Sequence, residues 1–599
     1  MSLNPSQQRA VDSAGHVLIV ACPGSGKTHT LVERSARLLK ERSDVRLGIV
    51  TFGRAAADEL KARVVAKMGS QILPRIDSGT FHSLCLQQLE VLSANGRRPF
   101  GLAVEAHTAV LVHKAWQEVR RTNRRSVITQ EQVKRGIDYA KANRGLIPDD
   151  AHATDIKAAL DIYQSQLQAQ SLLDFSDIIE LTVRGMQSGQ LPPLGVTDLL
   201  VDEFQDADPT QVDWVLAHVA VGVRVTVVGD DDQSIFGFRH AAGYSGLMTF
   251  AQRTRAETIT LDTTYRCCRD VVVHASRLIA HNSERVRKTI RTANAITGTV
   301  DRQDFGSFTE EVEALAQQLY ERPAGESAAV LTRTNELLRV IQTYMDAREM
   351  PYRGGVDGSI WSGGAPGLIR GLIGAAVGKD LSGITMALSA RGMNYEANIA
   401  AREAITAAKG SFDALLGKER WTHGLNDRQV SIWNDARADY AHLASAARGP
   451  AMEFVRIAIK FIAPGVDGIA NPKLLEKIEQ ILSRLPESLP EMYRALEQFI
   501  RQAGKGTSIE DTQATMLMTL HASKGLEFDR VWMPAMRQGV LPSAKTSDVA
   551  EERRLCYVGM TRARQRLTLS YSPRADHPPS VFLTEMGLGL PEVRARAQR

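Results

Sequence analysis

Short runs of apolar residues recur along the first part of the chain, and each ends at a polar or glycine-rich segment. The runs are residues 17–20, 48–52, 199–201 and 225–228. Uninterrupted apolar strands that alternate with helices are typical of a parallel sheet covered on both faces. Ligands of such sheets bind at the carboxyl ends of the strands, where these polar segments fall. The pattern therefore predicts an α/β lobe with a ligand site along one edge of its sheet.

A second set of β-rich runs predicts another lobe of the same kind. Residues 92–172 and 357–507 interrupt the two sets with helical periodicity and no strands. Glycines at 354–355 and 363–364 open the second helical stretch and predict a hinge. The runs of the second set are residues 259–261, 329–331, 516–518, 531–533 and 567–569.

Two α/β lobes, each with a helical insertion, account for the length of the chain. A chain of 599 residues is far above the size of a single domain. Its hydrophobic fraction of 43% and charged fraction of 24% are those of an ordinary globular protein. We expect a first lobe at residues 1–91 and 173–257 with its insertion at 92–172, and a second lobe at 258–356 and 508–599 with its insertion at 357–507.

Charge and cysteine content place limits on partners and compartment. A net charge of +5 permits a polyanionic partner but does not require one. The five cysteines have no metal-ligand spacing, and the adjacent Cys267 and Cys268 are poorly placed for a disulfide. The chain shows no signal-like start and no apolar stretch of roughly 18 residues. We therefore expect a cytoplasmic protein without structural zinc, an iron–sulfur cluster or a membrane partner.

The first polar segment, residues 21–28, has the form of a phosphate-binding Walker A loop, with Ala21 at the usual first glycine. Glycines let backbone N–H groups surround phosphates, and the following helix adds its positive dipole end. Lys27 would neutralise β- and γ-phosphate oxygens, and the Thr28 hydroxyl would ligate Mg2+. A simple glycine-rich turn is the alternative, which the strand–loop–helix context disfavours. We expect ATP to contact Gly24, Ser25, Gly26, Lys27 and Thr28.

The sequence Asp-Glu-Phe-Gln-Asp at residues 202–206 follows the apolar run 199–201. Its first two acids therefore fall at the carboxyl end of a predicted buried strand. Asp202 would complete the metal site through water, and Glu203 would be the general base on the attacking water. Adjacent acids are common on protein surfaces, but this sequence after a buried strand is typical of an ATPase.

Another strand end carries three aspartates followed by Gln233. This amide is expected to sense the γ-phosphate. Phe236, Phe238 and Arg239 come next, and two aromatic rings with an arginine suit a platform for stacking bases. For either phenylalanine alone, core packing is the favoured alternative.

Taken in order, the motifs resemble those of the UvrD/Rep/PcrA group of superfamily 1 DNA helicases, from residue 3 to about residue 583. The resemblance implies two RecA-like P-loop lobes. Residues 3–7 resemble the Q motif, in which Gln7 would bind adenine. Residues 51–57 and 79–83 resemble motifs Ia and Ib, which implies DNA contacts by Phe52 and His82, and Arg54 could bind a DNA phosphate at a position where the chain departs from the family. Residues 173–177 resemble the segment that returns to the first lobe, 202–206 motif II, and 229–241 motif III.

The second lobe carries the remaining motifs of the family. Residues 264–266 resemble motif IV, 519–528 motif V and 551–563 motif VI. The resemblance implies adenine stacking by Tyr265, a γ-phosphate contact by Arg266, a ribose contact by Glu527, DNA contacts by His521 and Lys524, and an arginine finger at Arg562.

Three positions depart from the family pattern. Phe238 stands where the family usually has Trp, so stacking survives with less area. Arg54 and Ala55 stand where the family usually has Asn-Lys, which leaves the DNA contacts of that motif open. After Leu569 the family usually carries a longer hairpin, whereas residues 570–578 are few and contain two prolines, which suit a loop better than a paired strand. The short segment weakens the expectation of duplex unwinding more than that of translocation.

The sequence therefore predicts an ATP-dependent 3′–5′ DNA helicase that moves along single-stranded DNA. ATP and Mg2+ are the expected cofactors. Single-stranded DNA and its junctions with duplex DNA are the expected partners. We expect the protein to be localised at the nucleoid. The nearest alternative is a single-strand translocase that strips proteins or drives a repair or defence complex. A non-catalytic DNA-binding adaptor is disfavoured by the complete set of ATP-site residues, and an RNA-directed motor by the type of motifs.

Overall fold

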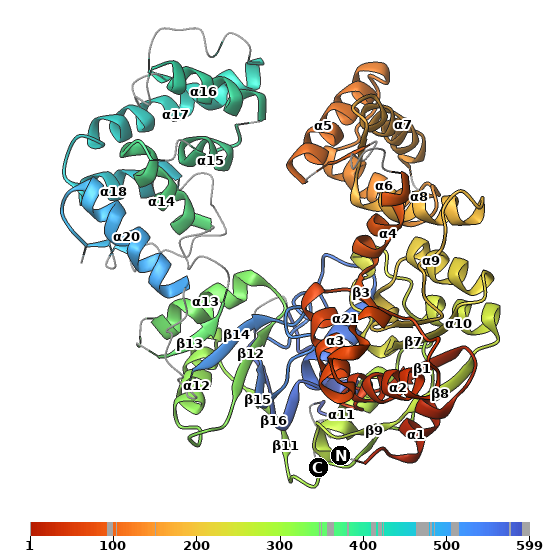
Figure 1. The fold of residues 1–599 in the computed structure, drawn as a ribbon. Helices are drawn as coiled ribbons and strands as arrows, with labels where there is room; N and C mark the ends of the chain where they lie inside the picture. The colour runs from red at the N-terminus through yellow and green to blue at the C-terminus, as the bar shows by residue number, and fades with distance from the viewer. Residues whose placement is uncertain are drawn as a thin grey trace, which may run out of the picture. The chain divides into compact units, whose positions relative to one another are not determined.

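The first six-stranded sheet is entirely parallel, with strand order β3-β2-β6-β7-β1-β8 (Figure 1). The structure is a computed structural model, and four of its strands coincide with the first four predicted runs. Two strands differ from the prediction: β3 was not among the predicted runs, and the sequence pattern assigned β8 to the second set. Strand β8 pairs with β1 instead, because an apolar run predicts a buried strand but not its neighbour. The bounds are β1 Val17–Ala21, β2 Leu47–Thr51, β3 Ile76–Thr80, β6 Asp198–Val201, β7 Arg224–Gly229 and β8 Glu257–Leu261.

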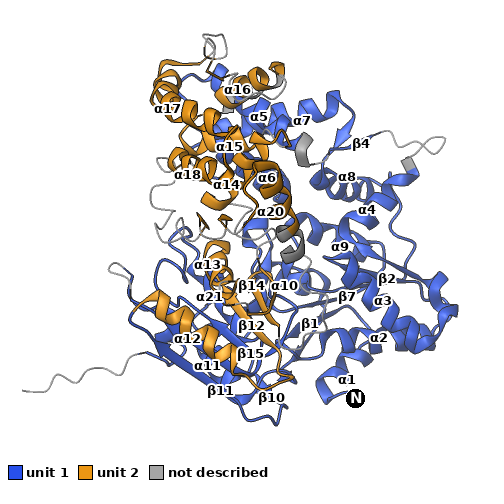
Figure 2. Cartoon of the chain, turned by 90° about the vertical axis from the view of Figure 1, so that its left-hand side faces the viewer, with its two compact units in different colours: residues 1–306, 523–599 blue, residues 307–522 orange. Residues whose placement is uncertain are grey.

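Seventeen ranges of the chain are described, and they fall into two compact units (Figure 2). One unit comprises residues 1–306 and 523–599, and the other comprises residues 307–522. The described residues are 2–92, 100–103, 105–149, 151–346, 348, 350–355, 364–379, 382–393, 395–408, 415–416, 422, 425–462, 478–479, 482–483, 485–504, 514–573 and 577–589.

Both faces of the first sheet are buried, which explains the unbroken apolar runs. In β1, Val17 and Ile19 pack into one core, whereas Leu18 and Val20 pack into the other. The first core is completed by α1 Pro5–Asp12, α2 Lys27–Glu41 and α3 Arg54–Met68. The second is completed by α4 Phe81–Leu89, α8 Phe175–Gln187, α9 Pro209–Ala220 and α10 Gly243–Thr254.

A helical subdomain with its own core interrupts the first lobe, in the region where helices without strands were expected. Lys141 of this subdomain reaches the start of α8, where its Nζ lies 2.6 Å from Asp174 and 2.7 Å from Asp177. These buried ion pairs tie the subdomain to the lobe. Its elements are α5 Glu105–Thr122, α6 Gln130–Ala142 and α7 Ala153–Ala169, with the short parallel pair β4 Gly101–Leu102 and β5 Leu172–Leu173 at its base.

Part of the second set of strands lies in the same unit as the first sheet. Three parallel strands run in the order β11-β16-β15. Residues 574–576, in the predicted short loop after β16, lie outside the described residues. The elements are β11 Thr299–Asp304, β15 Phe528–Met533 and β16 Ala563–Tyr571, the short pair β9 Thr263–Thr264 and β10 Arg291–Thr292, and the helices α11 Arg269–Ile279, α21 Val549–Met560 and α22 Val581–Glu585.

The other unit holds parallel strands in the order β12-β14-β13 and a helical region with a core of its own. Gly354 and Gly355 have φ angles of 75° and 93°, and residues 356–363 of the predicted hinge lie outside the described residues. The elements are β12 Ala328–Thr332, β13 Tyr352–Gly354, β14 Thr515–Thr519, α12 Phe308–Tyr320, α13 Asn335–Asp346, α14 Gly364–Ala376, α15 Ser382–Ala390, α16 Tyr395–Ala407, α17 Asp427–Ala446, α18 Ala451–Ile462 and α20 Leu489–Gly504.

The α/β class with two sets of parallel strands and helical insertions is confirmed. The exact domain boundaries remain a prediction, because the two compact units divide the chain more coarsely than the four predicted segments do. Within the described part of the chain, every helix falls short of the length and apolar character that a membrane crossing needs.

Candidate active site

The phosphate loop runs from the end of β1 at Ala21 to the start of α2 at Lys27. Gly24 and Gly26 have φ angles of 70° and 77°, a conformation that favours glycine. The amino end of α2 has no side-chain cap, so its first N–H groups are available to an anion. The Ser25 hydroxyl is buried and has no hydrogen-bond partner among the described residues. An orphaned hydroxyl beside an uncapped helix end fits a phosphate.

Lys27 contacts the general-base candidate directly. Its Nζ lies 2.7 Å from Glu203 Oε1, and Gln205 Nε2 donates to Glu203 Oε2 over 2.5 Å. Glu203 adopts a φ of 53°, an uncommon value for a residue other than glycine. Burial by itself would raise the pKa of Glu203, but Lys27 and Lys524 lower it to about 2. Burial and the Glu203 charge raise the pKa of Asp202 to about 6. The two adjacent carboxyls are therefore driven apart in pKa, as at many acid–base sites.

Lys524 lies inside this site. Its Nζ is 2.5 Å from Asp206 Oδ2 and 3.1 Å from the Gln233 carbonyl oxygen. Its side chain is only 14% exposed. The resemblance implied that Lys524 lies along DNA, whereas here the ammonium joins motif V to motifs II and III. Asp206 Oδ1, on the other side of the same carboxylate, is buried without a partner in the described part of the chain.

Gln233 joins motif III to motif VI. Its Nε2 donates to Asp230 Oδ2 over 2.6 Å, and its Oε1 accepts from Arg562 Nη2 over 2.8 Å. The Arg562 guanidinium also donates to the carbonyl oxygens of Val558, at 2.9 Å, and Leu526, at 3.2 Å. Burial and the nearby Arg266 lower the pKa of Arg562 to about 10. The predicted γ-phosphate sensor and arginine finger are therefore in contact.

Arg266 of motif IV and Glu527 of motif V form a second group of charged residues in the site. Arg266 Nε lies 2.6 Å from Glu527 Oε2, and Arg564 pairs with the second oxygen of the same carboxylate. A Cβ atom on Gly24 would lie 2.5 Å from the Arg266 Cβ, so motif IV packs directly on the phosphate loop. A cavity of about 290 Å3 opens here, lined by Gly24, Tyr265, Arg266, Asn294, Ile296, Glu527, Asp529 and Arg564.

The Q motif contacts both the phosphate loop and motif IV. Gln7 is buried, and its Nε2 donates to the Ser25 carbonyl oxygen over 2.9 Å. Its Oε1 accepts from the Asn4 backbone N–H over 2.9 Å. The Asn4 side chain donates to the Tyr265 hydroxyl over 3.0 Å. Gln7 thus holds the phosphate loop through its amide nitrogen, and its contact with adenine remains a prediction.

Several pocket residues were missed in the sequence. Asn4 lies within the Q motif but had no role assigned from the sequence, and in the structure it caps α1 and contacts the pocket residue Tyr265. Arg564 follows Arg562 by two residues, which places it in β16 beside the site. Asn294 and Asp529 had no sequence signal, because their place depends on how the loop before β11 and strand β15 pass the cavity.

An exposed aromatic cluster lies in the second half of motif III. Phe238 is 61% exposed, so the core-packing alternative is wrong for this residue. The Phe236 and Phe238 ring centroids are 5.8 Å apart. The Arg239 guanidinium carbon lies 5.5 Å from both rings, and Lys524 Nζ lies 4.9 Å from the Phe236 ring. The cluster has the aromatic faces and the positive charge that base stacking requires.

Motifs Ia and Ib contribute further exposed side chains. Phe52 is 39% exposed and meets Phe81 edge to face at 5.6 Å. His82 meets Phe175 in the same way at 5.5 Å. Phe175 is 58% exposed at the first position of α8 and was not singled out in the sequence. An aromatic residue directly after a helix-capping Asp174 was the available signal. Arg54 begins α3 at the surface, and His521 follows β14 in the other unit.

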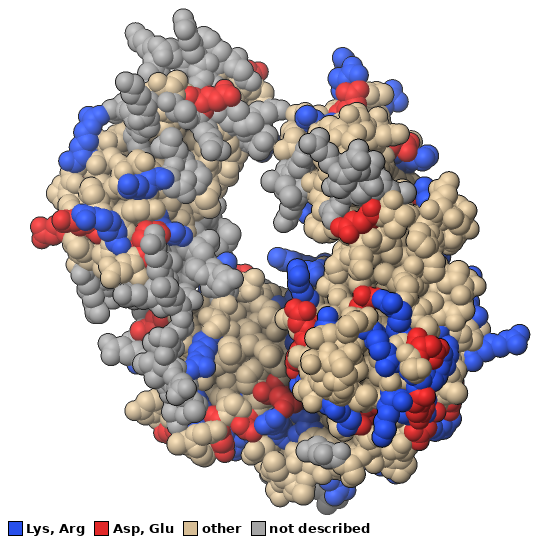
Figure 3. Space-filling model, viewed as in Figure 1, with Lys and Arg blue, Asp and Glu red and all other residues tan. Residues whose placement is uncertain are grey.

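Charged side chains of both signs lie on one face of the molecule. On the face seen in Figure 3, Lys and Arg side chains are interspersed with Asp and Glu side chains. This agrees with the modest net charge of +5. Long-range attraction to a polyanion is therefore a smaller effect here than local contacts.

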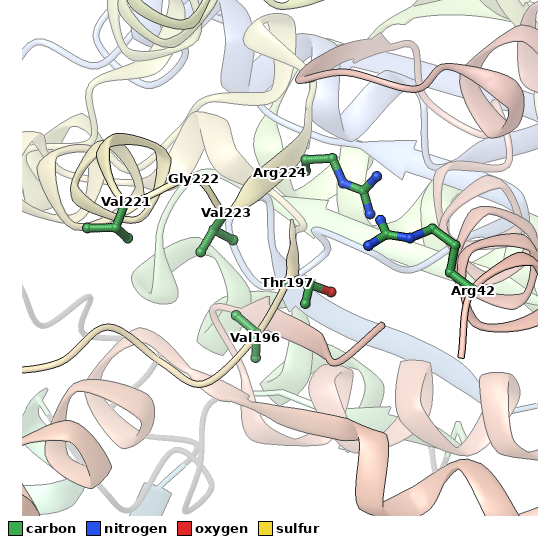
Figure 4. Close-up of a pocket in the computed structure, with 7 residues that line it drawn as sticks. All are labelled: Arg42, Val196, Thr197, Val221, Gly222, Val223 and Arg224. Atoms are coloured by element: carbon green, nitrogen blue, oxygen red, sulfur yellow. The ribbon is translucent and has the colours of Figure 1, made fainter. Parts of the chain in front are cut away.

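A second cavity, of about 420 Å3, lies at the amino ends of β6 and β7, the edge opposite the phosphate loop (Figure 4). Arg42 and Arg224 point toward one another across it. Each already has a carboxylate partner, Asp44 at 2.5 Å and Asp198 at 2.7 Å. The charges in this cavity are therefore neutralised, and it is unrelated to the nucleotide motifs.

Comparisons with known proteins agree with the geometry. The family model described as the UvrD/REP helicase N-terminal domain matches residues 3–253, and the UvrD-like helicase C-terminal domain matches residues 469–574. DNA helicase II of Escherichia coli is 28% identical, over 100% of this chain and 89% of the relative. The ATP-dependent DNA helicase Rep of the same organism is 27% identical, over 98% of this chain and 94% of the relative.

A third relative, the ATP-dependent DNA helicase PcrA of Staphylococcus epidermidis, is 26% identical over 98% of this chain and 86% of the relative. The three relatives therefore span both lobes and both insertions. Both family models, the order of the motifs and the convergence of those motifs in the structure point the same way. The chain belongs to the UvrD/REP helicase family.

Proposed function

We propose that this protein is an ATP-dependent DNA helicase that moves in the 3′ to 5′ direction along single-stranded DNA. One observation carries the proposal. Lys27 and Glu203 from the first lobe lie in one unit with Arg266 and Arg562 from the second set of motifs. A non-catalytic DNA-binding adaptor would not need both this lysine–glutamate pair and the two arginines in one site. The printed names of the relatives, which are DNA helicases, support the choice of DNA as the track.

ATP binding would activate the general base. The β- and γ-phosphates would attract Lys27, which now pairs with Glu203 at 2.7 Å. Loss of that cation raises the pKa of Glu203 from its present value of about 2 toward the range of an effective base. Glu203 would then accept a proton from the attacking water. Its uncommon backbone conformation holds the carboxylate at the carboxyl end of β6.

Thr28 and Asp202 would hold Mg2+, and their oxygen donors suit that ion. The orphaned Ser25 hydroxyl and Asp206 Oδ1 fit a site that takes up phosphate and ordered water. Bound Mg2+ would supply the positive charge that stabilises the phosphate oxygens of the leaving group. Gly24, Ser25 and Gly26 would contribute backbone N–H groups, while Tyr265 would stack on adenine, Glu527 would bind ribose and Gln7 would contact the base edge.

Arg266 and Arg562 would stabilise the charge of the transition state. Both guanidiniums are held in place by contacts within the chain, Arg266 by Glu527 and Arg562 by Gln233. Preorganised cations of this kind need little rearrangement during the reaction. Gln233 contacts Arg562 directly, so loss of the γ-phosphate would change the contacts of motif III.

Lys524 would connect hydrolysis to the DNA track. It contacts the Gln233 carbonyl oxygen on one side and the Phe236 ring on the other. A shift of motif V would therefore move a cation relative to the stacking cluster. The proposed DNA contacts are Phe52, Arg54, His82, Phe175, Phe236, Phe238, Arg239, His521 and Lys524.

One assay separates the proposal from its alternative. ATP turnover and strand displacement are measured on 3′-tailed, 5′-tailed and blunt duplexes, with streptavidin displacement from biotinylated single strands in parallel. Unwinding of the 3′-tailed duplex alone supports the helicase and its preference for single-strand/duplex junctions. Unwinding of the 5′-tailed duplex alone contradicts the polarity. Absence of DNA-stimulated ATP turnover contradicts the proposal as a whole.

The alternative is a single-strand translocase that strips proteins or drives a larger repair or defence complex. The observation in its favour is the short segment after β16, where Pro573 and Pro578 leave little room for a strand-separating hairpin. Streptavidin removal without unwinding would establish it. In either case a protein that works on chromosomal DNA would act at the nucleoid in the cytoplasm, which imaging of a fluorescent fusion would test.

A further inference from the structure

Lys288 lies in the segment between α11 and β10, outside every motif singled out in the sequence. Its side chain has 0% exposure. Its Nζ lies 2.7 Å from Asp230 Oδ1, 2.7 Å from Asp231 Oδ1 and 3.0 Å from Asp232 Oδ2. It also donates to the Ala21 carbonyl oxygen, at the start of the phosphate loop, over 3.3 Å. One ammonium therefore joins motif III to the phosphate loop.

The neighbouring residues fix this arrangement. Arg285 donates to both oxygens of Asp232, at 2.8 and 2.6 Å, and the Val286 N–H donates to Asp231 over 2.6 Å. The three carboxylates lie close enough together to hold a metal ion. The Lys288 ammonium, however, already contacts all three. The cluster is therefore satisfied by a cation of the chain itself.

A buried ion cluster is weak evidence of stabilisation, because desolvation of the charges offsets most of their attraction. Its geometric consequence is more specific. Asp230 accepts from Lys288 through Oδ1 and from Gln233 Nε2 through Oδ2, at 2.7 and 2.6 Å. An amide has donors on one end and an acceptor on the other. With its nitrogen turned to Asp230, Gln233 must present its oxygen to Arg562.

We propose that Lys288 is a positioning residue for ATP hydrolysis, acting through Asp230 and Gln233 on Arg562. The inference rests on the proposed function and adds to it a residue that touches no substrate. Lys288 holds the Asp230 carboxylate at one oxygen so that the other oxygen faces the Gln233 amide. Without that ammonium, the Asp230 carboxylate is free to turn, and the amide loses its fixed orientation. Arg562 then loses the acceptor that aims its guanidinium.

Lys288→Met tests the proposal, with Arg287→Met as the matched control. Arg287 precedes Lys288 and is exposed. We expect kcat of Lys288→Met, per nucleotide-binding molecule, to fall by about 10- to 100-fold, the range for losing a supporting contact. KM for ATP and the Kd for a fluorescent ATP analogue should stay within about threefold, because the phosphate loop is intact. An unchanged kcat per nucleotide-binding molecule, with any loss of total activity explained by a smaller folded fraction, would overturn the proposal.

A double-variant cycle tests the route. If Lys288 acts through Gln233, the double variant Lys288→Met/Gln233→Ala should have the kcat of Gln233→Ala alone. If the double variant instead loses kcat by the product of the two separate losses, the route does not pass through Gln233, and the proposal is overturned.

Asp230→Asn keeps the protein testable if Lys288→Met does not fold, because Asp231 and Asp232 still satisfy Lys288. The new amide nitrogen at position 230 would face Gln233 Nε2. The Gln233 amide would then turn around, so that its N–H donors would face the N–H donors of Arg562. The same kcat-specific loss is expected, and an unchanged kcat would overturn the proposal. Wild-type protein without ATP turnover would instead overturn the proposed function together with this inference. Wild-type turnover with normal variants would overturn the inference alone.

Discussion

Arg562 Nη2 donates to Gln233 Oε1 over 2.8 Å, which joins two residues 329 positions apart in the chain. The contact sets the predicted arginine finger against the predicted γ-phosphate sensor. The finger therefore starts from a defined position. Arg562 is 1% exposed, so its charge is shielded from water and acts strongly on a nearby phosphate.

Substitution of Arg562 tests this relationship. In Arg562→Ala we expect ATP hydrolysis to fall by about 10³-fold, the size of an arginine-finger effect, with nucleotide binding retained. Steady-state turnover and titration with a fluorescent nucleotide measure the two quantities. Arg566→Ala is the control, since Arg566 lies in β16, the strand that follows Arg562, is exposed and pairs with Asp301. A turnover rate equal to wild type would show that another residue performs this task.

Lys27→Ala should abolish ATP hydrolysis. The variant loses the cation that the phosphates would bind, and Glu203 loses its nearest charge partner, at 2.7 Å. DNA-stimulated phosphate release is the measurement. Lys40→Ala, an exposed position in the last turn of the same helix, should behave as wild type. Turnover retained in Lys27→Ala would remove the nucleotide-site assignment.

Lys524→Met should destabilise the fold. The change leaves the Asp206 carboxylate, whose side chain is 4% exposed, without its cation. Loss of one partner from a buried pair costs about 3–5 kcal/mol. Urea unfolding measures the free-energy change. The double variant Lys524→Met/Asp206→Asn should recover much of the loss, because no charge is then left unpaired. If the double variant is no more stable than Lys524→Met, the ion pair is not the cause.

Phe238→Ala should weaken the coupling of single-stranded DNA to ATP turnover. Base stacking on an aromatic ring contributes about 1–3 kcal/mol, so the DNA concentration for half-maximal stimulation should rise by about 5- to 150-fold. Because Phe238 is 61% exposed, stability should change little. Phe238→Trp should restore or strengthen the coupling. Stimulation equal to wild type in Phe238→Ala would mean that this ring does not stack on DNA.

His218 should make stability depend on pH. The buried ring accepts from the Leu194 N–H through Nε2 over 3.2 Å, and its Nδ1 lies 2.9 Å from the Trp214 carbonyl oxygen. Burial lowers the pKa of His218 to about 4, against about 6.5 in the unfolded chain. The unfolded state therefore binds the proton first as pH falls. The contribution of His218 is complete above pH 6.5 or so and is lost toward pH 4, amounting to about 3 kcal/mol.

Urea unfolding at a series of pH values measures this slope. His218→Gln should flatten the pH dependence between about pH 4 and pH 6.5 relative to wild type. His281→Gln, at an exposed position, is the control and should leave the slope unchanged. An equal slope in wild type and His218→Gln would show that the acid sensitivity arises from other groups.

The sequence by itself determined four of the six strands of the first sheet and the phosphate loop. Strands such as β1 send alternate side chains into two cores, so every position must be apolar, and that pattern is visible without a structure. The loop at residues 21–28 was equally predictable, because its glycines and Lys27 serve a local turn. Motif order predicted that Arg266 and Arg562 would share a site with Lys27.

Only the tertiary structure decided which charges meet. Lys524 pairs with Asp206, and Lys288 contacts all three aspartates that follow β7, and neither pairing was predicted from the sequence. The strand at 257–261 joined the first sheet because of its neighbour, not its composition. Partners of this kind are separated by tens to hundreds of residues, and their pairing depends on how the chain folds back. Local propensity and periodicity report burial and element type, whereas the choice of a long-range partner is made by packing.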